Sequence, residues 1–260
     1  MTERPAGEVL YRNQGRVVVV TGASGGIGNA IATAFAKSGA QVISLDVIPT
    51  EQARADIGFI RCDVSDPEDC KRAFQQVIER FGYVDVLVNN AAIQPTESYH
   101  PIHEVDEEVI ERMTSVNLLG YLRMARLALP VMLEQEAGVI VNIASGQAHR
   151  TAREVGIYGP IKSANLMQTR QWAVEYARQG VRVVSVSPGA IDTPMVRSTL
   201  AAQGGEEALA NRHPLGRLGK ADEVANAVLW LASEDAAFIT GTDLEVDGGL
   251  GAFGAFAEPY

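Results

Sequence analysis

Short runs of apolar, mostly β-branched residues alternate along the chain with longer segments in which apolar residues recur at helical spacing. The run "RVVVV" at 16–20 reads as a strand that is covered on both faces. The segment that follows, "GIGNAIATAFAKSG", places Ile27, Ile31 and Phe35 on one helical stripe and ends at Gly39. Because strands and helices alternate, we expect parallel strands joined by helical crossovers on both faces of one sheet.

The same pattern predicts the remaining elements. Further strands are expected at 41–46, 58–63, 84–90, 138–144 and 181–187, with a short last strand in "TDLEVDGG". Helices are expected after Asp66-Pro67, from about 106 to 135, from about 157 to 179, and in "ADEVANAVLWLAS". The predicted fold class is therefore α/β, a doubly wound parallel sheet of about seven strands with helices on both faces.

The organisation of the chain indicates a single domain over residues 1–260, because no repeat, low-complexity tract or linker divides it. Residues 1–14 read as a polar N-terminal extension. The segment at about 192–214 is polar and contains "AAQGGEE", so we expect a mobile loop near the substrate. The apolar tail at 251–260 is expected to pack on another surface, with a neighbouring subunit as one candidate.

Composition and charge narrow the classes of function. The net charge of −10 argues against nucleic acid or an anionic membrane as the main partner. We find no apolar run of the roughly 18 residues that a membrane span needs, and no signal-peptide pattern at the start. Cys62 and Cys70 suggest no disulfide framework, so the cytoplasm is the expected location.

A glycine-rich turn, Thr21 to Gly28, lies directly between the first strand and the first helix. In that context the backbone N–H groups and the helix N-terminus can approach a pyrophosphate. A tight turn needs glycine in any case, so the glycines alone are weak evidence. The turn lacks the Lys-Ser/Thr pair of a nucleoside-triphosphate loop, which disfavours ATP and GTP.

The second strand ends at Asp46, eighteen residues after Gly28. A carboxylate at this point can accept hydrogen bonds from both hydroxyls of the adenosine ribose, and it would repel a 2′-phosphate. The nearest basic candidate, Arg54, lies in the loop beyond. An ordinary strand-end aspartate is the alternative, but the spacing favours NAD over NADP as the cofactor.

The stretch "GIYGPIKSANL" puts Tyr158 and Lys162 four residues apart, around Pro160. Four residues is one helical turn, so both side chains can project from the same face. Proline breaks a helix interior but is tolerated in the first turn, where its missing N–H has no intrahelical partner. We therefore expect a helix that begins near Ile157 or Tyr158, with both side chains directed toward the carboxyl ends of the strands.

With these motifs in order, the sequence resembles the short-chain dehydrogenase/reductase family over essentially all of residues 15–250. The matching pieces are "TGASGGIG", "CDVSD", "NNAA", Asn117 in "SVNLLG", "VNIASG", the Tyr158–Lys162 pair, "SPGAIDTP" and "GTDLEVDGG". The resemblance implies a Rossmann fold and an NAD-dependent oxidoreductase that acts on CH–OH groups. It departs from the family at Ala92, where glycine is commoner, and in the middle of "YGPIK".

The resemblance implies four catalytic residues. Tyr158 would be the general base in alcohol oxidation and the general acid in ketone reduction. Lys162 would favour the phenolate and bind the nicotinamide ribose, and Ser145 would hold the substrate oxygen. Asn117 would hold a water next to Lys162 and complete a proton path. Each residue also has an ordinary structural reading: a helix pair, a strand end or a buried polar group.

The resemblance also implies a cofactor site made from several turns, and no metal. The expected cofactor residues are Gly22, Ser24, Gly25, Gly26, Ile27, Gly28 and Asp46; Asp63 and Val64 at adenine; Asn89 and Ala91 at the ribose; Pro188, Gly189, Ile191 and Thr193 at the nicotinamide; and Tyr158 with Lys162.

The expected substrate contacts are less specific. Besides Ser145 and Tyr158, they are Gln94, Gln147, His149 and Arg153, from the loops after the fourth and fifth strands. Such a density of polar groups would suit a hydroxyl-rich or carboxylated small molecule, although these side chains could also simply face solvent. For His149 in particular, the commoner role is that of a solvated loop residue.

Three hypotheses for the function follow. The first is an NAD-dependent dehydrogenase of a small polar secondary alcohol, namely a sugar, a polyol or a cyclic alcohol. The second is a ketone or 3-oxoacyl thioester reductase that uses NADPH. The third is a non-catalytic binding or regulatory protein on the same fold, which the complete set of four catalytic residues disfavours. The family also implies a homo-oligomer, commonly a tetramer, with a small-molecule substrate as the main partner.

Overall fold

The computed structural model describes residues 7, 9–50, 54–200 and 204–253. They contain one seven-stranded sheet with the order β3-β2-β1-β4-β5-β6-β7, in which every neighbouring pair is parallel. The strands are β1 Val17–Thr21, β2 Gln41–Asp46, β3 Ile57–Arg61, β4 Val86–Asn89, β5 Gly138–Ile143, β6 Val181–Pro188 and β7 Asp243–Val246. The predicted fold class, a doubly wound Rossmann sheet, is confirmed.

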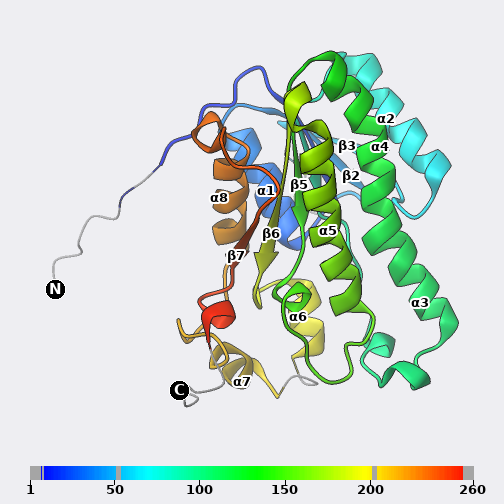
Figure 1. Cartoon of the computed structure of the whole chain (residues 1–260), viewed down its shortest axis with the longest axis vertical. Coiled ribbons are helices and arrows are strands. Elements are labelled where there is room, and N and C mark those ends of the chain that lie inside the picture. Colours follow the sequence, from blue (N-terminus) through cyan, green and yellow to red (C-terminus); the bar gives the residue numbers. More distant parts are fainter. Residues whose placement is uncertain (1–6, 8, 51–53, 201–203, 254–260) are drawn as a thin grey trace.

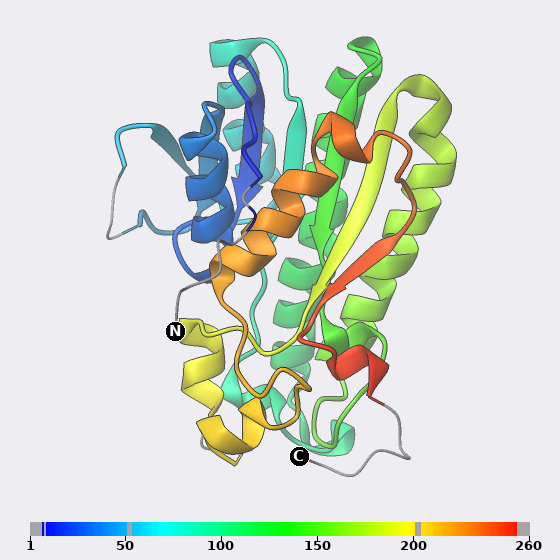
Figure 2. The ribbon, with the colours of Figure 1, turned by 90° about the vertical axis from the view of Figure 1, so that its left-hand side faces the viewer.

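Helices cover both faces of the sheet (Figures 1 and 2). One layer holds α1 Gly26–Lys37 and α8 Ala221–Leu231, and the other holds α2 Pro67–Phe81, α4 Gly120–Glu134 and α5 Tyr158–Tyr176. Successive residues of a strand face opposite sides of a sheet, so β1 contributes to two hydrophobic cores. Val17 and Val19 pack in the core under α2 and α4, and Val18 and Val20 pack in the core under α1 and α8.

The helix expected over 106–135 is interrupted, so that expectation was too simple. The structure has α3 Glu107–Thr114, then a π-helical turn over Ser115–Leu119, then α4. A π turn adds a residue to the helical repeat and often occurs at functional sites. It contains Asn117, whose side chain it turns into the protein interior.

The stretch Glu107–Glu134 has the length and hydropathy of a membrane-spanning helix. Its apolar side chains are nevertheless used in the fold, since Met124, Ala128 and Met132 are fully buried in the core on that face of the sheet. We therefore assign this stretch to the core of the domain.

Helix α5 begins at Tyr158, as predicted, and Pro160 lies in its first turn. The proline therefore costs the helix no hydrogen bond. The α-helix ends at Tyr176 and continues as a single 3₁₀ turn over Ala177–Gln179, which matches the predicted end near 179.

The polar segment at 192–214 contains two short helices, α6 Pro194–Thr199 and α7 Glu206–Ala210. Residues 1–6 and 8 of the N-terminal extension, residues 201–203 of this segment and residues 254–260 of the tail lie outside the described part of the chain. Short 3₁₀ turns complete the structure, at Thr96–Ser98, Ile102–Glu104, Gly146–Ala148, Glu234–Ala236 and Leu250–Ala252.

Candidate active site

A cavity of about 840 Å³ lies where the strands end. Its walls include Gly22 after β1, Asp46 at the end of β2, Ala91 after β4 and Ser145 after β5. All strands are parallel, so their carboxyl ends meet at one edge of the sheet, beside α6 and α7 (Figure 1). In an open α/β sheet this edge, at the point where the strand order reverses, is where ligands bind.

The glycine-rich turn folds tightly against the loop after β4. Gly22 has a positive φ of 64°, and a side chain there would bring a Cβ within 2.7 Å of Ala91 Cα. A Cβ on Gly28 would lie 2.2 Å from the carbonyl oxygen of Gly22. Gly25 precedes α1 and gives its N-terminus no side-chain cap. Because Gly25, Gly26 and Ile27 line the cavity, the first turn of α1 offers backbone donors that suit a pyrophosphate.

Two predicted cofactor residues of this turn stand behind the cavity wall. Neither Ser24 nor Gly28 lines the cavity. The Ser24 hydroxyl donates to the carbonyl of Ile48, and its backbone N–H donates to Asp46 Oδ2 at 2.9 Å. Both residues therefore shape the turn, and a direct contact between the Ser24 side chain and a cofactor is not supported.

The Asp46 carboxylate is held by its neighbours in the cavity wall. Besides Ser24 N–H, it accepts the backbone N–H of Val47 at 2.7 Å. Arg54, the nearest basic residue in the sequence, is half-buried, and its Nη2 lies 2.7 Å from Asp56 Oδ2. Among the described lining residues, none that comes from β1 to β3 or from the loops directly after them is a lysine or an arginine. This end of the cavity thus suits ribose hydroxyls better than a 2′-phosphate.

Asn89, which we expected at the ribose of the cofactor, does not line the cavity, and the next residue, Asn90, does. Asn89 is fully buried in β4, does not line the cavity, and donates to Asn142 Oδ1 at 2.9 Å. Asn90 lines the cavity instead, and its Nδ2 donates to the carbonyls of Thr21 and Gly22, each at 2.9 Å. Side chains alternate along an extended segment, so consecutive asparagines point to opposite sides. The second asparagine of "NNAA" is the signal that the sequence offered.

The other predicted cofactor residues line the cavity. The Asp63 carboxylate accepts the N–H and the hydroxyl of Ser65, at 2.9 and 2.7 Å. Thr193 caps the N-terminus of α6 by accepting the N–H of Val196. The full set that lines the cavity is Gly22, Gly25, Gly26, Ile27, Asp46, Asp63, Val64, Ala91, Tyr158, Lys162, Pro188, Gly189, Ile191 and Thr193.

Ser145, Tyr158 and Lys162 meet in the middle of this wall. Ser145 follows β5, the other two come from the first turns of α5, and all three line the cavity. Burial raises the pKa of Tyr158 well above its usual value and the nearby Tyr99 adds to this, whereas the hydrogen bond with Ser145 lowers it. Burial also lowers the pKa of Lys162 to about 7. The Lys162 ammonium donates to the carbonyl of Ile143 at 2.7 Å.

Asn117 lies behind the cavity wall rather than in it. Its side chain pairs with the backbone of Ile93, accepting the N–H and donating to the carbonyl, both at 2.8 Å. The backbone carbonyl of Asn117 accepts a hydrogen bond from Asn165 Nδ2 at 3.1 Å. These contacts tie the π turn to the loop after β4 and to α5. The role of Asn117 in a proton path stays a prediction.

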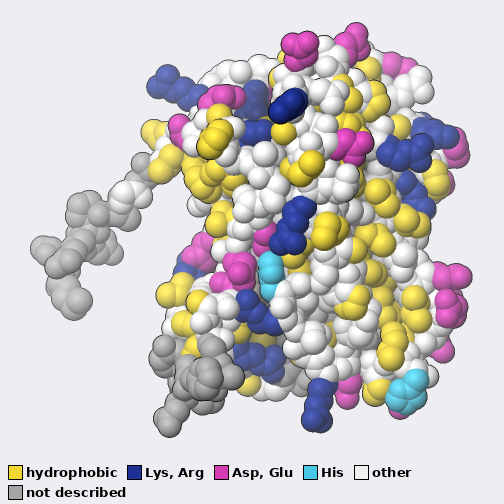
Figure 3. Space-filling model, in the orientation of Figure 1, with side chains coloured by type: hydrophobic (Ala, Val, Ile, Leu, Met, Phe, Trp, Pro, Cys, Tyr) yellow, Lys and Arg dark blue, Asp and Glu magenta, His cyan; other side chains and the backbone are white. Residues whose placement is uncertain are grey.

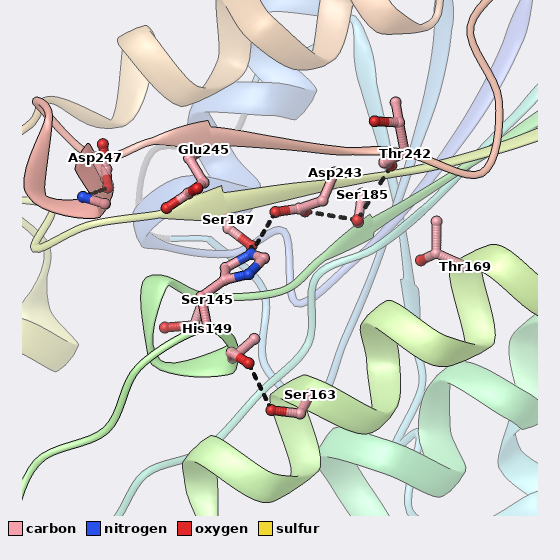
Figure 4. Close-up of polar contacts among 12 residues, drawn as sticks. Ser145, His149, Ser163, Thr169, Ser185, Ser187, Thr242, Asp243, Glu245 and Asp247 are labelled. Carbon is pink, nitrogen blue, oxygen red and sulfur yellow. Dashed lines mark hydrogen bonds and ion pairs between the residues drawn. The ribbon is translucent and has the colours of Figure 1, made fainter.

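Two of the predicted substrate residues do not face the cavity. Gln94 and Gln147 line it, but His149 and Arg153 do not. The turn at Gly146–Ala148 carries His149 toward β6 and β7, where its Nε2 lies 2.8 Å from Asp243 Oδ2 (Figure 4). Arg153 is exposed. We therefore remove His149 and Arg153 from the substrate set, because loop direction, which sequence spacing does not report, turns them away.

Sequence reasoning also missed several lining residues. Three arginines, Arg112, Arg150 and Arg212, line the cavity together with Tyr99 and His213. Arg150 lies 3.0 Å from Glu245 Oε2, which anchors it to β7. His213 is buried and accepts the N–H of Ala190 at 3.1 Å, so it supports the turn after β6. Arg150 was visible in the polar run after Ser145, whereas the others come from distant segments.

Comparison with known proteins identifies the family. The family model described as enoyl-(acyl carrier protein) reductase matches residues 22–251. The 2-(R)-hydroxypropyl-CoM dehydrogenase of Xanthobacter autotrophicus is 40% identical over 90% of this chain and 97% of its own. A 3-oxoacyl-[acyl-carrier-protein] reductase of Thermotoga maritima is 35% identical over 92% of this chain and 99% of its own. The structure of an aldohexose dehydrogenase from Thermoplasma acidophilum matches with a TM-score of 0.88 and 37% identity, covering 96% and 98% of the two chains.

These relatives span nearly the whole chain, and the aldohexose dehydrogenase structure has the same fold, so the resemblance predicted from the motifs is confirmed. Members of this family are oxidoreductases that use nicotinamide cofactors and small-molecule substrates. The chain therefore belongs to the short-chain dehydrogenase/reductase family.

Proposed function

We propose that this chain is an NAD-dependent dehydrogenase of a small polar secondary alcohol, such as a sugar, a polyol or a cyclic alcohol. One observation carries the proposal. Ser145, Tyr158 and Lys162 line the middle of a cavity whose wall also contains the glycine turn and Asp46. A dinucleotide that spans these parts would bring its nicotinamide beside the three polar side chains. Bound NAD would supply the hydride acceptor, C4 of the nicotinamide.

The protein's own contribution is to hold the alcohol and to take its proton. Ser145 is positioned to hydrogen-bond the alcohol oxygen, which orients the C–H bond toward the cofactor. Tyr158 accepts the hydroxyl proton as the general base. In the reverse direction the same phenol donates a proton to a ketone oxygen.

The electrostatics explain why Tyr158 needs help. A buried phenol is a poor base near neutrality, because burial raises its pKa. The hydrogen bond with Ser145 works against that shift of the pKa. A positive charge on Lys162, whose Nζ lies 5.6 Å from the Tyr158 ring centre, would act in the same direction as Ser145. Both favour the phenolate over the neutral phenol, so Tyr158 depends on each of them.

The preference for NAD over NADP is supported by the surroundings of Asp46. A 2′-phosphate would meet this carboxylate with no arginine or lysine among the described lining residues from β1 to β3 and the loops directly after them. The repulsion between the Asp46 carboxylate and the 2′-phosphate, with no nearby cation to offset it, would weaken the binding of NADP. Two ribose hydroxyls would instead donate to the carboxylate.

A polar substrate is supported by polar side chains that line the cavity. Among the described residues, the buried Gln94 Nε2 and Gln147 Oε1 have no hydrogen-bond partner, and a purely apolar substrate would leave them unpaired. The two dehydrogenases reported above are named for 2-(R)-hydroxypropyl-CoM and for aldohexose, which are both hydroxyl-bearing compounds.

A panel of secondary alcohols tests this proposal. Sugars, polyols, cyclic alcohols and hydroxy acids would each be offered with NAD and with NADP, and NAD(P)H absorbance followed. We expect turnover of at least one polar alcohol with NAD, and a kcat lower by roughly 10² to 10⁴ for the Tyr158→Phe variant. Turnover confined to apolar ketones would contradict the proposed substrate class.

A reductase of ketones or 3-oxoacyl thioesters is the second candidate, favoured by the 35% identity to the Thermotoga maritima enzyme. It would ordinarily use NADPH. A strong measured preference for NADPH over NADH in ketone reduction would therefore promote it above the dehydrogenase.

We also propose a homotetramer, in the cytoplasm, that uses the exposed faces of α4 and α5. Figure 3 shows hydrophobic side chains gathered over this part of the surface. Met167 is 59% exposed, Val174 is 85% exposed, and Leu119 in the π turn is also exposed. Apolar surface of this kind commonly marks an interface. Light scattering on the purified chain tests the number of subunits.

A further inference from the structure

A second tyrosine lies directly behind the lysine of the proposed active site. Tyr121 belongs to the first turn of α4 and is 1% exposed. In the sequence it sits within an apolar helix face, where phenylalanine would pack equally well. A buried phenol needs a partner for its hydroxyl, and here that partner is part of the active site.

Three polar groups form a closed triangle at this point. Lys162 Nζ donates to the carbonyl of Ile143 at 2.7 Å and to the hydroxyl of Tyr121 at 3.2 Å. The Tyr121 hydroxyl donates its own proton to the same carbonyl at 2.9 Å. Since a phenol has one proton, Tyr121 can only be an acceptor toward Lys162. The ammonium form of Lys162 has three N–H protons, and it donates two of them within this triangle, to Ile143 and to Tyr121.

The triangle matters because the lysine is buried. Burial disfavours an ammonium and lowers the pKa of Lys162 to about 7, while hydrogen bonds to the charged form act in the opposite direction. The titratable groups that face this ammonium in the described structure are Tyr121 from α4 and Tyr158 from its own helix, with ring centres 5.1 and 5.6 Å away. Tyr99 faces Tyr158 in turn.

We propose that Tyr121 is a positioning residue for the reaction, whose hydroxyl holds the Lys162 side chain in place and in its charged form so that it can act on Tyr158. This inference rests on the proposed function, in which Lys162 supports Tyr158 as the base. Without the Tyr121 hydroxyl the lysine keeps its contact with Ile143 but loses one of two acceptors. It would then be neutral over more of the physiological pH range, and Tyr158 would lose cationic support.

The Tyr121→Phe variant tests the proposal, because it removes only the hydroxyl. The chain contains four lysines, so ¹³C-labelled lysine side chains give few NMR signals, and Lys162→Met identifies the one that belongs to Lys162. In the full-length variant we expect the Lys162 titration midpoint to fall by about one pH unit. The acid limb of the kcat profile for alcohol oxidation should move to higher pH, so that activity recovers as the pH is raised.

Tyr83→Phe is the matched control, since it also removes one phenol hydroxyl, which donates to the Gly15 carbonyl at 2.8 Å far from the site. It should change neither the titration nor the profile. A folded Tyr121→Phe protein with an unmoved Lys162 midpoint overturns the proposal, and so does a moved midpoint with an unmoved profile. The titration needs no turnover. A chain that oxidises no alcohol would therefore defeat the proposed function while the NMR result still decides whether Tyr121 holds the charge.

Discussion

The two ends of the cavity differ in whether backbone atoms or side chains form the binding surface. At the end that we propose for the adenosine half of the cofactor, backbone geometry dominates, because Gly22 and Gly28 let the turn after β1 close against its neighbours and Asp46 is fixed by backbone N–H groups. At the substrate end, side chains from loops dominate, among them Gln94 and Gln147. A site made of backbone tolerates few substitutions, whereas a site made of loop side chains can change its ligand without disturbing the fold.

Between the two ends, the catalytic residues sit on the rigid parts. Tyr158 and Lys162 come from the start of a 19-residue helix, and Ser145 follows closely after β5, a strand that has neighbours on both sides. The catalytic residues, the cofactor-binding end and the substrate-binding end are therefore separate parts of the site. Each of the following substitutions should affect mainly one of these three parts.

The largest effect is expected at the centre. Tyr158→Phe removes the only proton acceptor proposed for the alcohol, so kcat should fall by roughly 10² to 10⁴. The ring stays in place, so NAD affinity, measured by calorimetry, should change little. A loss of NAD binding equal to the loss of rate would show that the catalytic and cofactor parts are not separable. Retained full turnover would contradict the mechanism.

A smaller effect is expected at the cofactor end. Asp46→Asn keeps an acceptor for the Ser24 N–H but removes the charge, so the fold should hold while discrimination against NADP weakens. Hydrogen bonds to a charged group contribute on the order of 1.5–3 kcal/mol, so the ratio of the NAD and NADP dissociation constants should shift about tenfold or more. Fluorescence titration with both cofactors measures this ratio, and an unchanged ratio would remove the argument for NAD.

A pair of glycine substitutions sharpens the contrast between backbone and side chain. In Gly28→Ala the new methyl group would lie 2.2 Å from the carbonyl oxygen of Gly22, so we expect a loss of about 1–3 kcal/mol in the free energy of unfolding. In Gly25→Ala the methyl group meets no atom within 4 Å but enters the cavity wall. That variant should lose less than about 1 kcal/mol of stability and bind NAD more weakly. Chemical denaturation and NAD titration distinguish the two outcomes.

The same contrast explains how much could be predicted from the sequence. The position of the glycine turn between β1 and α1, of Asp46 at the end of β2 and of Pro160 in the first turn of α5 depends on local spacing, which the sequence states directly, and the structure places these features where they were expected. Spacing alone could not decide whether Asn89 or Asn90 lines the cavity, because that depends on which side of the sheet each side chain faces at the end of β4. The role of Tyr121 could not be predicted from the sequence, because a tyrosine within an apolar helix face is typical of a hydrophobic core. Its contact with Lys162 forms only when α4 and α5 pack together.

At the substrate end, loop folding decided the outcome. His149 and Gln147 are two residues apart in one polar run, yet Gln147 lines the cavity and His149 is directed toward Asp243 (Figure 4). Gln147 lies within the 3₁₀ turn Gly146–Ala148, and His149 follows directly after it. Spacing in a loop carries no such information, because loops have no fixed side-chain period.

The smallest expected effect tests this last distinction. Gln147→Ala should raise KM for the polar alcohol about tenfold, because one hydrogen bond to the substrate is lost, with little change in stability. His149→Ala should leave KM unchanged and lower the free energy of unfolding by about 1 kcal/mol, because the largely buried Asp243 carboxylate loses one hydrogen-bond partner but keeps Ser185. Steady-state kinetics and urea denaturation of both variants, run side by side, check each claim. An increase in KM for His149→Ala as large as that for Gln147→Ala would mean that this loop rearranges when substrate binds, and that the substrate end is organised by its ligand rather than by the fold.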